Sequence, residues 1–98
     1  MNFELIFNDV SNKQMDDLQN SPDHQAIYHA TNKILGYIAT DLHHPSLNTH
    51  KYDAIAGANG EEVFEAYATN RTPGAYRIFW HYGPGEHQIT ILEIVPHP

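Results

Sequence analysis

The C-terminal stretch AYRIFWHYGPGEHQITILEIVPHP (75–98) combines one arginine and three histidines with two predicted strands. These four residues are Arg77, His81, His87 and His97. An arginine fork binds phosphate or carboxylate groups, and a histidine transfers protons near neutral pH. The stretch therefore predicts one of two arrangements: the working half of an active site, or a solvated hairpin face that stacks two cationic residues.

Strand geometry separates these side chains into two sets. Successive side chains on a strand point to opposite faces. Arg77 and His81 therefore share one face of the strand 76–82, and the apolar residues Ile78 and Trp80 occupy the other. We expect the apolar set to face the core and the polar set to project from an open face.

A second group of polar residues lies in the middle of the chain. His50, Lys51 and Tyr52 place a base, a cation and a phenol in a row. The interpretation that needs no chemical role, and that we favour, is a surface loop with Tyr52 packed against the core.

Neither a metal centre nor a nucleophile is indicated. Histidine ligands of zinc usually recur at short spacings such as H-x₃₋₅-H. Among the eight histidines, His24 and His29 have such a spacing near a helix start, but no third ligand accompanies them at a useful offset. Cysteine is absent, and no G-x-S-x-G elbow or glycine-rich phosphate loop is present. We therefore expect no metal and no cofactor.

Net charge restricts the partners. Five Lys and Arg oppose twelve Asp and Glu, which gives a formal charge of −7 with neutral histidines. Nucleic-acid binders usually present a basic face, because phosphate contacts supply much of their affinity. The chain is thus a poor non-specific binder of RNA or DNA at pH 7. The histidines titrate near pH ~6.5 when unperturbed, so this character changes in mild acid.

Length and hydropathy indicate how many domains the chain forms and in which compartment it is expected. Ninety-eight residues predict a single domain, 1–98, with a modest core. No stretch approaches the ~18 apolar residues of a membrane span, and the short acidic N-terminus lacks the basic start of a signal peptide. The absence of cysteine fits a reducing compartment. We expect a cytoplasmic protein without a membrane partner; its oligomeric state is left open.

Two helices are predicted in the first half. The alternation in FELIF (3–7) predicts a strand, and a short helix follows to about Asn20, capped by Asp9 or Ser11. Its apolar side is expected to hold Val10, Met15 and Leu18. A longer helix follows.

The longer helix has the clearest pattern in the chain. Ser21-Pro22-Asp23 is a typical helix start, and Pro45 ends the helix by about residue 42. Its apolar stripe is Ile27, Ala30, Ile34, Leu35, Ile38 and Leu42. We expect this stripe to pack on a sheet.

The second half predicts strands. Residues 43–62 contain several helix and strand breakers and are expected to form a loop, followed by strands at 62–68, 76–82 and 88–95. The order is β-α-α-β-β-β, an α+β fold with both helices packed on one face of an antiparallel meander. With a turn at 83–87, Tyr82 would oppose Gln88, and Arg77 would oppose Glu93.

Three motifs in this order resemble the RelE/ParE toxin superfamily. They are HHPSLNTHKYDAI after the long helix, GAYRIFWHY on a strand, and ITILEIVPH at the last strand. The resemblance runs across nearly the whole chain. It implies a toxin that an antitoxin protein silences. Such a toxin either cuts ribosome-bound mRNA without a metal or acts instead on a protein target.

The resemblance also implies roles for single residues. Arg77 matches the arginine that holds the scissile phosphate, and His97 matches a terminal basic residue that acts as a general acid. Lys51 matches a basic position that offsets phosphate charge. His50 and His81 lie next to these positions by the strand pattern and are candidates for substrate binding.

Two departures from the superfamily keep other functions open. Nuclease members are usually strongly basic, whereas this chain is acidic, and Tyr67 stands where many members have an arginine. The first alternative is a ParE-like protein-binding module without nuclease chemistry, which a continuous apolar groove would favour. The second is an unrelated small α+β protein that binds a ligand or metal, which three converging histidines would favour. A joint cleft of Arg77, Lys51 and His97 would favour the nuclease.

Overall fold

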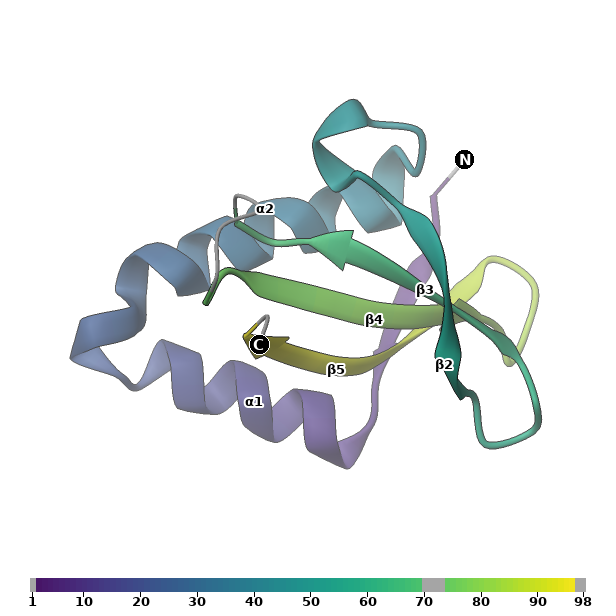
Figure 1. The fold of residues 1–98 in the computed structure, drawn as a ribbon, viewed down its shortest axis with the longest axis horizontal. Helices are drawn as coiled ribbons and strands as arrows, with labels where there is room; N and C mark the ends of the chain where they lie inside the picture. Colours follow the sequence, from purple (N-terminus) through teal and green to yellow (C-terminus); the bar gives the residue numbers. More distant parts are fainter. Residues whose placement is uncertain (1, 70–73, 97–98) are drawn as a thin grey trace.

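Two α-helices and a five-stranded sheet make up the described chain (Figure 1). The computed structural model describes residues 2–69 and 74–96. In chain order the elements are β1 (Glu4–Phe7), α1 (Asp9–Gln19), α2 (Gln25–Thr40), β2 (His50–Ala56), β3 (Glu62–Tyr67), β4 (Tyr76–Tyr82) and β5 (Gln88–Pro96). The predicted α+β class is confirmed, with β2 as an additional strand.

Helix α1 begins one residue earlier than its predicted caps. The Asn8 side chain accepts a hydrogen bond from the Ser11 amide at 2.8 Å and caps the helix in place of Asp9 or Ser11. Ser11 is fully buried, and its hydroxyl donates to the Ile91 carbonyl at 2.8 Å. Placing Val10 on the apolar side was wrong: Ser11 takes the inward position and leaves Val10 51% exposed.

Helix α2 packs its predicted stripe against the sheet. Ile34, Leu35 and Ile38 are buried, and Ile27 is partly buried against the same core. A 3₁₀ turn, Pro22–His24, precedes the helix, consistent with the predicted start. The helix ends at Thr40, a little before the predicted end near residue 42.

The strands lie in the order β1-β5-β4-β3-β2. Neighbours are antiparallel except β1, which runs parallel to β5 and makes the sheet mixed. The prediction of a loop over 43–62 was wrong for residues 50–56, which form β2. This strand lies at the sheet edge with most side chains exposed, so it lacks the apolar alternation that identifies a half-buried strand.

The register between β4 and β5 differs from the predicted one by two residues at Arg77. Tyr82 pairs with Ile89 rather than Gln88, and Arg77 pairs with Val95 rather than Glu93. One residue of the difference comes from the turn. The other comes from a shift in pairing between Phe79 and Trp80, which a uniform strand pattern does not reveal.

The sheet buries side chains on both faces. On the helix-covered face, the core includes Leu18, Ile34, Leu35, Ile38, Ala66, Ile78, Trp80, Ile89, Ile91 and Ile94. On the opposite face, β2 bends across the sheet (Figure 1), and the Tyr52 ring lies 4.7 Å from the Phe79 ring. Phe79, His81 and Glu65 are buried on this side. The expectation of an open face was therefore wrong, because β2 covers it.

Candidate functional site

One buried carboxylate holds an arginine and a histidine together. The Oε2 atom of Glu65 lies 2.6 Å from Nη1 of Arg77, and its Oε1 atom lies 2.7 Å from Nε2 of His50. The Glu65 side chain is 3% exposed and the Arg77 side chain 13%, whereas that of His50 is 50% exposed. The cluster His50–Glu65–Arg77 thus runs from the interior of the covered face to the surface.

Sheet register explains why these residues meet. In β3, Glu65 pairs with His50 of β2 on one side and with Phe79 of β4 on the other. Paired residues project from the same face, so all three side chains lie on the face that β2 covers. Arg77, two residues before Phe79, shares that face and reaches Glu65 diagonally.

Aromatic rings enclose the guanidinium. The Arg77 Cζ atom lies 4.8 Å from the centroid of the Phe79 ring and 5.6 Å from that of the Tyr52 ring. Cations are attracted to aromatic faces at such distances. The buried Nε of Arg77 has no hydrogen-bond partner. The guanidinium therefore retains one donor that a ligand oxygen would satisfy.

His50 has an acceptor at each ring nitrogen. Its Nδ1 lies 2.9 Å from the Asn48 carbonyl oxygen, and its Nε2 faces the Glu65 carboxylate. A carbonyl only accepts, so Nδ1 carries a proton. The Nε2 contact then needs a second proton, which sits either on the imidazole or on the carboxyl group. The two residues hold a proton that can move between them, as in a general acid–base pair.

His81 is separated from this cluster by its own contacts. Its Nδ1 lies 2.7 Å from the Tyr82 carbonyl oxygen, and its Nε2 lies 4.0 Å from a Glu61 carboxylate oxygen. Its side chain is only 7% exposed. A substrate-binding role for His81 stays a prediction, and it would require the 57–61 turn to move aside.

Lys51 lies on the opposite face of the sheet from Arg77. It pairs with Phe64, which stacks on Trp80 on the helix-covered side. Its Nζ atom lies 2.9 Å from Glu62 and 3.6 Å from Asp53. The hydrogen bond with Glu62 is the main reason that the pKa of Lys51 is raised above its ordinary value. The structure therefore does not bring Lys51 and Arg77 into one cleft.

His97 lies outside the described residues. Its chain neighbours are placed, however: Pro96 pairs with Tyr76, and Val95 pairs with Arg77. The end of β5 thus lies beside the arginine. The general-acid role that the resemblance gives to His97 stays a prediction.

Glu65 was missed as a site residue. The alternation of 62–67 places it on one face with Val63 and Tyr67, where a lone acid between apolar neighbours is unusual. A buried acid on one strand and a lone arginine on the next favour an ion pair. The pairing between the strands was the information that the sequence lacked.

The described residues show neither a metal cluster nor a membrane helix. Within 2–69 and 74–96, no three His, Cys, Asp or Glu side chains converge as metal ligands would. No helix in the same part of the chain is long and apolar enough to cross a membrane. Three converging histidines, which would have favoured a metal-binding protein, are thus not found among these residues.

Solved toxin structures share this fold. No protein-family model matches the sequence, and no curated protein matches it. A YoeB/ParE toxin from Agrobacterium tumefaciens superposes with a TM-score of 0.68 at 8% identity, covering 98% of this chain and 100% of the other. The archaeal RelE–RelB complex from Pyrococcus horikoshii OT3 gives 0.65 at 16% identity, with 98% and 96% covered. The YoeB dimer from Staphylococcus aureus gives 0.67 at 11% identity, with 100% of both covered.

The fold is that of a small toxin. Because 96–100% of each chain is covered, the likeness extends over nearly the whole fold and is not limited to a common substructure. The chain therefore has a RelE/ParE-like toxin fold, as the sequence motifs predicted.

Proposed function

We propose that this chain is a RelE-like toxin that cleaves RNA without a metal, with the cluster His50–Glu65–Arg77 at its centre. The observation that carries the proposal is the pairing of an arginine fork and an imidazole on one buried carboxylate. Such a set supplies phosphate binding and proton transfer together. The similarity to RelE and YoeB structures supports the fold that presents it.

Each residue has a separate task in this mechanism. Arg77 binds the scissile phosphate and stabilises the charge that develops on it. Glu65 orients His50 through Nε2, and Nδ1 exchanges a proton with RNA in place of the Asn48 carbonyl. A carboxylate on one ring nitrogen and a substrate on the other is a recurrent arrangement for a histidine base.

The chemical step needs no further reactant. As RNA displaces the Asn48 carbonyl, the His50–Glu65 pair releases one proton to solvent, which leaves the neutral imidazole with its single proton on Nε2 and a free lone pair on Nδ1. Nδ1 then takes the proton of the ribose 2′-hydroxyl, the 2′-oxygen forms a bond to phosphorus, and the bond from phosphorus to the 5′-oxygen breaks. The 5′-oxygen receives a proton from a general acid, the role we assign to His97. The products are a 2′,3′-cyclic phosphate and a 5′-hydroxyl end.

Cleavage assays with matched variants test the proposal. Purified protein is incubated with ribosome-bound mRNA, and growth is followed after induced expression. His50→Gln should lower the cleavage rate about 10²–10⁴-fold, and His29→Gln, at an exposed position on α2, should not. If the wild-type chain neither inhibits growth nor cleaves ribosome-bound mRNA, the nuclease proposal is lost.

A second candidate is a toxin-fold module that binds a protein without cleaving RNA. Two observations favour it: Glu65 already neutralises the charge of Arg77, and the chain carries a formal charge of −7. Both weaken phosphate binding. An inactive wild-type chain that still binds a protein target would support this alternative.

An antitoxin is the protein partner that we propose in either case. One similar structure is a RelE–RelB complex, which shows this fold bound to a second chain. We also propose that the protein acts in the cytoplasm. Co-expression with the product of the neighbouring open reading frame should relieve growth inhibition, and a frame that encodes no such protein would contradict the partner.

A further inference from the structure

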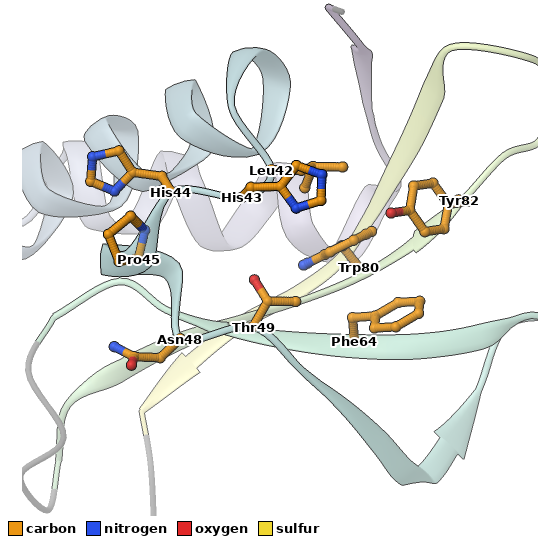
Figure 2. A pocket seen from close by; sticks show the side chains of 9 residues that line it. All are labelled: Leu42, His43, His44, Pro45, Asn48, Thr49, Phe64, Trp80 and Tyr82. Carbon is orange, nitrogen blue, oxygen red and sulfur yellow. The ribbon is translucent and has the colours of Figure 1, made fainter.

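A hollow on the helix-covered side of the sheet lies apart from the His50–Glu65–Arg77 cluster. It encloses about 370 Å³ between the end of α2, the 3₁₀ turn Pro45–Leu47 and strands β3 and β4. Its lining consists of Leu42, His43, His44, Pro45, Asn48, Thr49, Phe64, Trp80 and Tyr82 (Figure 2). Cavities that hold small molecules begin at about 300 Å³, so this one has room for a ligand.

The wall of the hollow is aromatic. Phe64 stacks on Trp80 with ring centroids 4.9 Å apart, and Tyr82 meets the edge of Trp80 at 5.1 Å. The Tyr82 ring is half exposed, at 50%. The exposed Tyr82 ring, beside the buried Trp80 and the partly buried Phe64, offers a flat surface on which another ring can stack.

One buried donor in this wall has no partner. Trp80 is 1% exposed, and its indole Nε1 makes no hydrogen bond. Figure 2 shows this nitrogen and the Thr49 hydroxyl turned toward the same space, with the His43 ring close by. An indole N–H only donates, so a ligand in this hollow would need an acceptor atom to satisfy it. His43 and Thr49 are exposed side chains and can rotate to admit one.

The lining also defines the charge of the ligand. It contains no Lys, Arg, Asp or Glu. His44 is engaged elsewhere, stacked on Tyr37 at 3.8 Å and accepting from the Ser46 amide. A phosphate or carboxylate would therefore find little compensation in this hollow, whereas a neutral flat ring would find stacking surface and a donor.

We propose that this hollow binds a neutral heteroaromatic ring with an acceptor in its plane, the chemistry of a nucleobase. The ring stacks beside Tyr82, and its acceptor takes the hydrogen bond of the Trp80 indole. The base comes either from a free nucleoside or from a single-stranded nucleic acid. The site does not depend on RNA cleavage, because Trp80 and Arg77 project from opposite faces of the sheet.

Trp80 is the single tryptophan of the chain and reports directly on occupancy. Its fluorescence is followed while adenosine, guanosine, cytidine or uridine is added to the full chain. At least one nucleoside should give a saturable change. A 2′-deoxy tetranucleotide of the same base, which the proposed nuclease cannot cleave, distinguishes the sources: tighter binding indicates a base within a strand, and equal or weaker binding indicates a free nucleoside.

Variants locate the binding. Tyr82→Ala should raise the dissociation constant roughly tenfold through lost stacking, Thr49→Val should also raise it, and His29→Ala on α2 should leave it unchanged. Both rim positions are exposed, so these variants keep the fold. The proposal is overturned if no nucleoside gives a saturable change, or if neither Tyr82→Ala nor Thr49→Val weakens the binding.

Discussion

The Nε2 atom of His50 and the Oε1 atom of Glu65 lie 2.7 Å apart, and the other oxygen of the same carboxylate binds Arg77 at 2.6 Å. Glu65 is thus shared between a cation that is always charged and a group whose charge depends on pH. Because the carboxylate is buried, the loss of either partner leaves it poorly compensated. The cluster is therefore structural as well as a candidate for chemistry.

Removing the arginine tests the structural part. Arg77→Ala should lower the free energy of unfolding by about 3–5 kcal/mol, because a buried carboxylate loses its permanent cation. An exposed strand position would cost little, which is what the sequence pattern alone suggests. The double variant Glu65→Leu/Arg77→Met should recover much of the loss. Urea unfolding of the wild type, the single variant and the double variant measures the three free energies of unfolding. Equal stability of Arg77→Ala and wild type would contradict the burial of the pair.

The core face of α2 gives a second stability test. Ile34→Ala should cost about 2–5 kcal/mol, because Ile34 is 6% exposed within the main core. Val10→Ala on α1 is the control, since Val10 is 51% exposed and should change stability by about 0.5 kcal/mol or less. Thermal unfolding compares them. A neutral Ile34→Ala would mean that another face of α2 meets the sheet.

Local patterns revealed most of the fold but not the pairing of the strands. The stripe of α2 and the alternation of β4 are properties of single segments, and both appear in the structure as predicted. Edge strand β2 lacks alternation because its side chains are mostly exposed, so it resembled a loop. The predicted pairing partner of Arg77 was two residues away from the observed one. One residue of this difference comes from the turn and one from the irregularity in β5, and the amino-acid composition reveals neither.

The candidate site was predicted in part for the same reason. Arg77 was identified by residue type, but its partner Glu65 becomes visible only when β3 and β4 are paired. His50 and Lys51 are neighbours in sequence, yet they lie on opposite faces because β2 is a strand rather than a loop. A correct strand assignment at residue 50 would have separated them.

Acid should weaken the turn between β2 and β3 through Glu61. Backbone amides, first its own and then that of Asn59, lower the pKa of this carboxyl below its ordinary value of 4.5. A depressed pKa in the folded state contributes stability above the unfolded value, and this contribution is lost as pH falls through the folded value. Glu61→Gln should therefore reduce the dependence of stability on pH below about 4.5.

Unfolding curves at a series of acidic pH values measure this effect. Glu86→Gln is the control, because it removes an exposed carboxylate from the turn between β4 and β5. An unchanged pH profile in Glu61→Gln would contradict the role of Glu61 in holding this turn.

Affinity for RNA should depend on histidine charge. The formal charge of −7 opposes binding at pH 7.5, and the chain has eight histidines, a residue type that in its unperturbed form gains charge in mild acid, at about pH 6. Binding should therefore strengthen in mild acid and weaken with added salt. Titrations with a non-cleavable oligonucleotide at both pH values measure it. Equal affinity would show that histidines do not supply the phosphate contacts.

Two cations on opposite faces of the sheet separate the proposed chemistry from general charge. Arg77→Lys keeps the positive charge but loses the planar fork, and it should lower the cleavage rate by about 10²–10³-fold if the fork stabilises the charge developing on phosphate. Lys51→Ala removes a charge that is bound to Glu62 and Asp53 on the other face, and it should leave the rate close to that of wild type. Rates on ribosome-bound mRNA at saturating substrate compare the two variants, with circular dichroism as the check on folding. A severe loss in Lys51→Ala with an intact fold would contradict the separation of the two faces and return Lys51 to the site. Full activity in Arg77→Lys would show that charge alone suffices and that the bidentate geometry of the fork is not used.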